Sequence, residues 1–105
     1  MIIYGLKNCD TCRKALKALD NAVLVDVRED GLPEQVRDRA LALFGDRLVN
    51  TRSTTWRQLD ESERQKPALD LLAAYPALMK QPLISDGNAL LLGWGPETRK
   101  ALGVG

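Results

Sequence analysis

The two cysteines of the chain, Cys9 and Cys12, stand three residues apart and are the residues best suited to chemistry. A thiol attacks a disulfide as its thiolate, and two cysteines one helical turn apart can also form a disulfide with each other. This spacing indicates thiol–disulfide exchange. Cys9 is then the catalytic nucleophile, and Cys12 is the second catalytic candidate, as the cysteine that resolves a mixed disulfide.

The different roles of the two cysteines depend on a helix that should begin at Asp10. Cys9 would precede its first turn, where unpaired backbone N–H groups and the helix dipole stabilise a negative sulfur. Lys7 adds positive charge nearby. Cys12 falls on the apolar stripe of the helix. Burial there favours its neutral thiol, which suits a resolving cysteine but equally suits an ordinary core residue.

Composition excludes several other classes of function. The chain has no histidine, and two cysteines cannot close a four-ligand zinc site, so we expect neither a metal nor a bound cofactor. A net charge of +1 does not indicate nucleic-acid binding. We see no signal peptide and no apolar run long enough for a membrane span. We therefore expect a cytoplasmic monomer without membrane contact, and structural disulfides are rare in the cytoplasm.

Hydrophobic patterning predicts an α/β fold. The apolar stripes and turn residues predict helices at 10–19, 33–44, 54–59, 67–75 and 97–102, and strands at 1–4, 22–27, 83–85 and 89–92. Residues 28–31 read as a polar loop.

The resulting order is β-α-β, a helical block at about 33–79, a β-hairpin and a final helix. A parallel pair and an antiparallel pair of strands can then share one four-stranded mixed sheet. This is a thioredoxin-like layout with a helical insertion, and a length of 105 residues allows a single domain.

Four segments carry a resemblance to a known family. The sequence resembles the arsenate-reductase-like family, which includes the Spx transcription regulators and small thiol reductases, in Tyr4–Thr11, Asn50–Leu59, Gln81–Ile84 and Leu91–Trp94. The similarity is greatest to the thiol-reductase branch, which shares the Lys-Asn-Cys-Asp-Thr and Asn-Thr-Arg-x-Thr-Thr-Trp-Arg patterns.

The resemblance implies a thioredoxin-type fold in which Cys9 is the redox cysteine and Pro82 is a cis proline beside it. From sequence alone, a cis bond is expected at only about 5% of X–Pro positions. Arg52 could by itself face either the site or solvent, and the resemblance places it near the site. The implied substrate-binding residues are Lys7, Asn8, Thr11, Arg52, Gln81 and Pro82.

Two departures separate the chain from its better-known relatives. Arsenate reductases hold the oxyanion with three arginines, whereas the matching positions here are Asn50, Gln81 and Gly93. A multiply charged oxyanion needs cationic hydrogen-bond donors, so we do not expect efficient arsenate reduction. The second departure is Cys12, because many relatives carry another residue there, whereas the Spx regulators have the C-x-x-C pair as a redox switch. Against an Spx-like role, we note that the chain ends at Gly105 without the basic C-terminal extension associated with those regulators.

The sequence therefore predicts a cytoplasmic thiol–disulfide oxidoreductase that uses glutathione as co-substrate. Its partners would be glutathione or another small thiol or disulfide, with a glutaredoxin as a candidate protein partner. Two alternatives remain. One is an Spx-like regulator that binds RNA polymerase and is switched by a Cys9–Cys12 disulfide, and the other is arsenate reductase proper.

Overall fold

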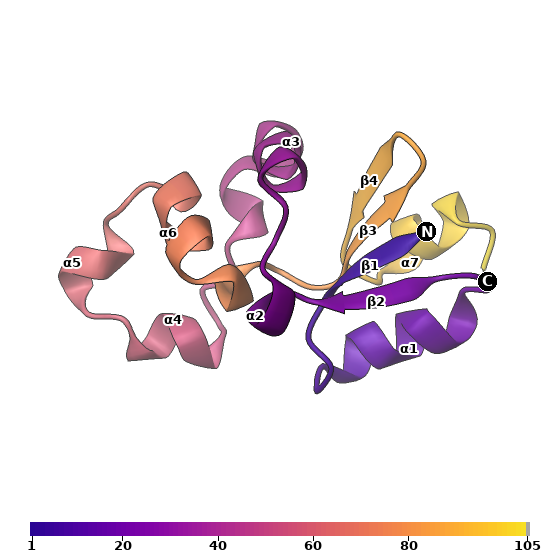
Figure 1. Ribbon diagram of the computed structural model, residues 1–105, viewed down its shortest axis with the longest axis horizontal. Coiled ribbons are helices and arrows are strands. Elements are labelled where there is room, and N and C mark those ends of the chain that lie inside the picture. Colours follow the sequence, from indigo (N-terminus) through magenta and orange to yellow (C-terminus); the bar gives the residue numbers. More distant parts are fainter. Residues whose placement is uncertain (105) are drawn as a thin grey trace.

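A four-stranded mixed sheet forms one half of the molecule (Figure 1). The computed structural model describes residues 1–104. The strand order is β2-β1-β3-β4: β1 is parallel to β2 and antiparallel to β3, and β4 completes the hairpin. The strands are β1 (Ile2–Gly5), β2 (Val23–Asp26), β3 (Leu83–Asp86) and β4 (Ala89–Leu92). The predicted thioredoxin-like arrangement of strands is confirmed.

Successive side chains of each strand point to opposite faces of the sheet, so each face has its own apolar cluster. On one face, Ile3 and Ile84 pack with Ala15 and Leu19, which come from α1 (Asp10–Ala18) and its C-terminal end. Leu102, which follows α7 (Pro96–Ala101), adds to this cluster. The opposite face belongs to a second, larger cluster that continues into the helices between β2 and β3.

The segment between β2 and β3 is helical, as predicted, and forms the other half of an elongated molecule of 41 × 26 × 24 Å (Figure 1). An isolated bridge between Val49 and Met79 joins the residue that follows η1 (Gly45–Leu48) to the end of the segment. The backbone N–H of Asn50 donates to the Leu78 carbonyl at 2.7 Å beside this bridge. From residue 34 onward its elements are α3 (Glu34–Phe44), η1, α4 (Thr54–Gln58), α5 (Glu61–Arg64), α6 (Ala68–Ala74) and η2 (Pro76–Leu78).

The predicted polar loop at 28–31 is wrong, because the chain forms a one-turn helix there, α2 (Val27–Asp30). The preceding strand accordingly ends at Asp26 rather than at Val27. The Asp26 carboxylate caps α2 by accepting hydrogen bonds from backbone N–H groups, and Val27 is fully buried. Gly31, at φ 74°, ends the turn in a conformation that favours glycine. The cap from Asp26 and the burial of Val27 thus favour a helical turn, although the polar composition of residues 28–31 favours a loop.

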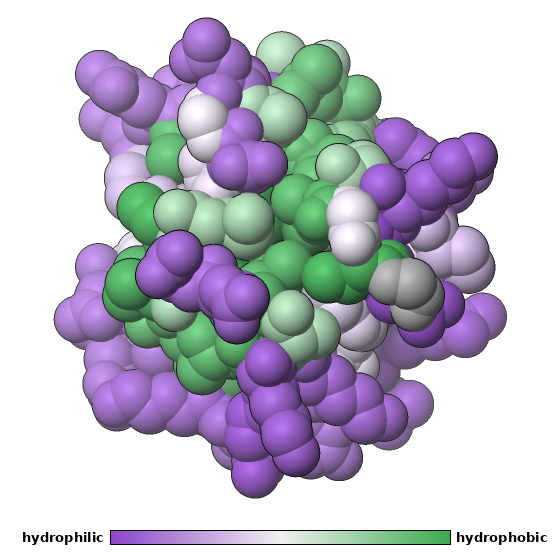
Figure 2. All heavy atoms as spheres, turned by 90° about the vertical axis from the view of Figure 1, so that its right-hand side faces the viewer, coloured by the Kyte–Doolittle hydropathy of each residue, from purple (hydrophilic) through white to green (hydrophobic). Residues whose placement is uncertain are grey.

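Figure 2 views the end of the molecule that carries the sheet and both termini, and apolar surface gathers there. Two apolar side chains near this end are exposed, Met1 at 36% and Val23 at 61%. They are neighbours, because the Val23 N–H donates to the Met1 carbonyl. Among residues 1–104, no helix has the length and apolar character needed to traverse a lipid bilayer.

Candidate active site

Cys9 occupies the N-cap of α1, directly after the loop that leaves β1. Its Sγ accepts a hydrogen bond from the Cys12 N–H at 3.4 Å, and its own N–H donates to the Leu6 carbonyl at 3.1 Å. The side chain is partly exposed. The sulfur therefore lies where the unpaired N–H groups and positive dipole end of a helix favour negative charge.

Cys12 has the opposite environment, although it is only one helical turn away. Its side chain is fully buried, and this burial raises the pKa of the Cys12 thiol to about 12. A hydrogen bond with Cys9 raises the pKa further in the same direction. The Cys12 Sγ donates to Oε1 of Gln81 at 3.7 Å. Cys12 is thus a neutral thiol at physiological pH, and both cysteines are free rather than disulfide-bonded.

Gly5 permits the close packing of α1 against β1 at this point. A Cβ atom placed on Gly5 would overlap the Sγ of Cys12 and lie 3.3 Å from its Cβ. A larger residue at position 5 would therefore push the helix that carries both cysteines away from the sheet. Gly5 therefore has a structural role that the spacing of the cysteines alone does not reveal.

Cys9 opens into a groove of about 390 Å³ between the sheet and the helical insertion. The cysteine loop and the start of α1 supply one wall, with Leu6, Asn8 and Thr11. The insertion supplies the facing wall, with Asn50, Ser53, Thr54, Thr55 and Ala77. Gln81 and Arg28 complete the lining. The groove is therefore assembled from segments far apart in the sequence and is rich in hydrogen-bonding groups.

Three of the residues expected to bind substrate, Asn8, Thr11 and Gln81, line this groove together with Cys9. Of the three positions where arsenate reductases use arginine, Asn50 and Gln81 line the groove here, and Gly93 does not. Two neutral amides therefore line the groove that contains the Cys9 sulfur, where the resemblance would place two cations.

Three expected site residues lie outside the lining of the groove. Lys7 is exposed, and its Nζ makes an ion pair with Glu29 at 2.8 Å. The hydrogen bond to Glu29 and its negative charge raise the pKa of Lys7. Arg52 is exposed in the connector before α4. Pro82 is fully buried, and the Gln81–Pro82 bond is cis, as the resemblance implied.

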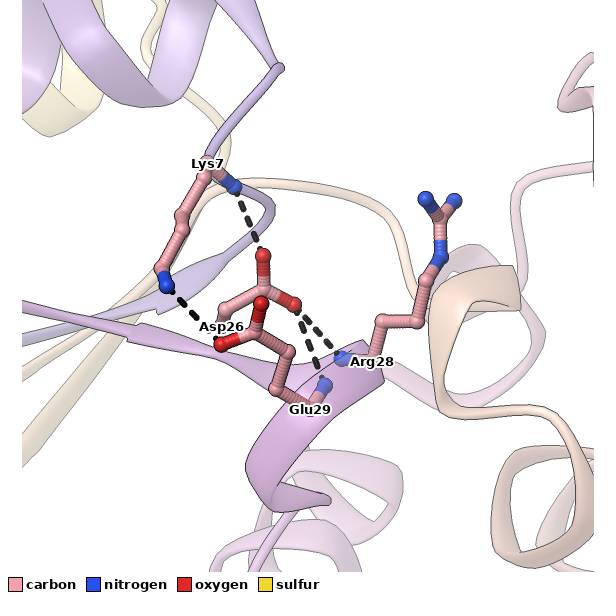
Figure 3. A network of polar contacts seen from close by, with 4 residues as sticks. All are labelled: Lys7, Asp26, Arg28 and Glu29. Carbon is pink, nitrogen blue, oxygen red and sulfur yellow. Dashed lines mark hydrogen bonds and ion pairs between the residues drawn. The ribbon is translucent and has the colours of Figure 1, made fainter.

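Asp26 joins the cysteine loop to the end of β2 (Figure 3). Its carboxylate accepts backbone N–H groups from Lys7 at 3.0 Å, Arg28 at 2.9 Å and Glu29 at 3.3 Å. The side chain is only 7% exposed. Burial alone would raise the pKa of Asp26, but the hydrogen bonds from Lys7, Arg28 and Glu29 outweigh it, so the pKa is lowered. This carboxylate is ionised at neutral pH and holds two backbone segments in register.

Sequence reasoning missed Arg28, whose side chain points away from the Asp26 carboxylate in Figure 3 and lines the groove. One signal could have found it. The parallel strands β1 and β2 end at paired residues, Gly5 and Asp26, so the residues that follow both strands lie at the same edge of the sheet. The loop with Cys9 follows the first strand, and Arg28 follows the second.

Comparison with known proteins identifies the family of the chain. Residues 4–102 match the model of the ArsC family. The chain belongs to the ArsC family. An uncharacterised protein of Haemophilus influenzae is 48% identical to this ArsC-family chain over 108 residues, covering 94% of the chain and 95% of that protein.

Two solved structures resemble this ArsC-family protein over nearly its full length. The structure of the YffB protein has a TM-score of 0.85 and 30% identity, covering 96% of each chain. An arsenate reductase (ArsC) related protein from Brucella melitensis has a TM-score of 0.69 and 32% identity, covering 95% of this chain and 91% of its own. The fold and family expected from the four motifs are therefore confirmed.

Proposed function

We propose that this protein is a thiol–disulfide oxidoreductase that acts on small disulfides, with Cys9 as nucleophile and glutathione as co-substrate. The observation that carries the proposal is the position of Cys9. Its sulfur caps the N-terminus of α1 and opens into a groove of about 390 Å³ with polar walls. A helix N-terminus favours the thiolate that attacks disulfides, and the groove provides room for a small substrate.

The reaction begins when the Cys9 thiolate attacks the glutathione sulfur of a mixed disulfide between glutathione and a second thiol. The sulfur–sulfur bond of the substrate breaks, a new bond forms to Cys9, and the second thiol leaves and takes up a proton. A further glutathione thiolate then attacks the adduct. Oxidised glutathione forms, and Cys9 returns as a thiolate. A glutaredoxin could replace glutathione in this second step.

Cys12 offers a second way to release glutathione from Cys9. Attack by the Cys12 sulfur would form a Cys9–Cys12 disulfide and liberate glutathione. The buried Cys12 thiol must first lose its proton, which is costly because burial raises its pKa to about 12. We therefore propose that external glutathione resolves the adduct faster than Cys12 does.

Arsenate reduction proper receives less support from the geometry. Two positions where arsenate reductases use arginine are the neutral amides Asn50 and Gln81, and both face the groove. Neutral donors stabilise a multiply charged oxyanion less than guanidinium groups do. A small disulfide, which carries no charge at its reacting sulfur, makes no such demand.

The experiment measures reduction of hydroxyethyl disulfide by glutathione, with oxidised glutathione detected through glutathione reductase. We compare the wild type with Cys9→Ser and Cys12→Ala. The Cys9 variant should fall to the uncatalysed rate, and the Cys12 variant should keep at least half of the wild-type rate. The proposal fails if the wild type and Cys9→Ser reduce the disulfide equally slowly. Loss of activity in Cys12→Ala alone would instead assign resolution to Cys12.

A further inference from the structure

The Cys9 groove has few charged side chains in its lining. Among the described residues that line it, apart from the nucleophile Cys9, Arg28 is the only one with a charged side chain, and the others are apolar or neutral and polar. Within residues 1–104, the Arg28 guanidinium has no acidic group within ion-pair distance. The groove that contains the Cys9 sulfur therefore also presents one cation that makes no ion pair with the described residues.

Other cations near the cysteine loop are placed differently. Lys7 is already paired with Glu29 at 2.8 Å. Arg13 lies 3.6 Å from Asp10 on the exposed side of α1. Neither lines the groove, so neither is available in the same way to a ligand that occupies it.

The backbone that carries Arg28 is held firmly relative to the loop that carries Cys9. One oxygen of the Asp26 carboxylate accepts the Arg28 N–H at 2.9 Å, and the other accepts the Lys7 N–H at 3.0 Å (Figure 3). The adjacent Val27 is fully buried. Asp26 thus holds the backbone at Arg28 against the loop that leads to Cys9.

We propose that the groove selects thiols and disulfides that carry a carboxylate close to the reacting sulfur, and that Arg28 binds this carboxylate. The inference rests on the proposed function of Cys9. Guanidinium and carboxylate groups form paired, charge-assisted hydrogen bonds, so the arginine would orient the substrate as well as attract it. A single arginine suits a singly charged group better than a multiply charged oxyanion.

The step that reveals this selectivity is the first attack. The Cys9 thiolate displaces one half of a symmetric disulfide, a mixed disulfide forms on Cys9, and the other half leaves as a thiolate that takes up a proton. No additional oxidant or reductant is required. The carboxylate that binds Arg28 belongs to the half that becomes attached to Cys9.

The test measures this single-turnover step with three symmetric disulfides that differ in charge: anionic dithiodipropionate, neutral hydroxyethyl disulfide and cationic cystamine. The rate for each is followed by the thiol released and by mass spectrometry of the Cys9 adduct. The proteins are the wild type, Arg28→Gln, Arg28→Lys and the control Arg57→Gln. Arg57 is an exposed arginine of α4 that does not line the groove, so its substitution removes the same charge elsewhere.

Arg28 is exposed, so in Arg28→Gln the ratio of the anionic rate to the neutral rate should fall by up to about fivefold, as for loss of an exposed ion pair. Arg57→Gln should retain the wild-type ratio, and Arg28→Lys should restore part of it. Equal ratios in Arg28→Gln and Arg57→Gln would overturn the inference, and so would equal slowing of all three disulfides. If no disulfide forms an adduct on Cys9, the proposed function fails together with the inference.

Discussion

Two identical side chains one helical turn apart have opposite chemical properties here. Cys9 caps α1 and faces a groove, whereas Cys12 is fully buried against β1 beside Gly5. The helix terminus favours charge on the first sulfur, and burial disfavours charge on the second. We therefore expect the environment of each cysteine, rather than the residue type, to decide which one reacts.

This contrast predicts selective alkylation. Iodoacetamide should modify Cys9 in the native protein and leave Cys12 unmodified, because Cys12 is fully buried and burial raises its pKa to about 12. In concentrated urea both cysteines should react. Peptide mass spectrometry after timed exposure to the reagent measures both rates. Labelling of Cys12 at a rate comparable with that of Cys9 in the native state would show that α1 does not protect it.

The cysteine loop could be predicted from sequence because its signals are local. The strand, the two cysteines and the amphipathic stripe lie within residues 1–19, so spacing alone placed Cys9 at the helix start. Arg28 could not be found in this way. It enters the groove only because β1 and β2 pair in parallel and Asp26 folds the next residues into a helical turn.

The turn that follows β2 shows how one carboxylate connects two elements. Asp26 caps α2 and also accepts the Lys7 N–H from the cysteine loop. Its three backbone donors keep the carboxylate ionised, because they lower the pKa below the ordinary 3.8. A group with a lowered native pKa stabilises the fold above its unfolded pKa. That contribution disappears as the pH falls through the native value.

Asp26→Asn should therefore destabilise the protein by about 1.5 kcal/mol at neutral pH, because one oxygen that accepts an N–H becomes an amide nitrogen. The difference from the wild type should shrink as the pH falls from about 4, where Asp26 of the unfolded chain takes up its proton, through the lower native pKa of Asp26. Urea unfolding at several pH values measures both effects. Asp30→Asn is the control, since Asp30 is an exposed carboxylate of the same short helix. Equal, pH-independent losses in both variants would contradict the role given to Asp26.

The long-range arrangement explains which features of the molecule the sequence could not predict. The strands and most helices follow from apolar periodicity within each segment. The groove, in contrast, depends on how the insertion sits beside the sheet: Ser53 and Ala77 approach Cys9 across more than forty residues of chain. A single sequence contains no periodic signal for such contacts. The cis bond at Pro82 likewise could be predicted only from the family resemblance, because residue spacing carries no signal for it.

One apolar cluster joins the two halves of the molecule. It includes Tyr4 and Leu83 of the sheet together with Leu48, Leu71 and Leu78 of the insertion, and all five side chains are buried. A shared core means that neither half can expose its apolar surface without exposing that of the other. We therefore expect the sheet and the insertion to unfold in a single transition, which would also keep the walls of the groove together until global unfolding.

The two tryptophans provide a direct test of this coupling. Trp56 lies in α4 of the insertion, and Trp94 packs against the cluster on the other face of the sheet. The single-tryptophan variants Trp56→Phe and Trp94→Phe should each show one urea transition by fluorescence that coincides with the loss of helical circular dichroism in the same variant. A fluorescence transition of Trp56 at lower urea than the loss of circular dichroism would show that the insertion unfolds first. The groove would then open before the sheet that carries Cys9 unfolds.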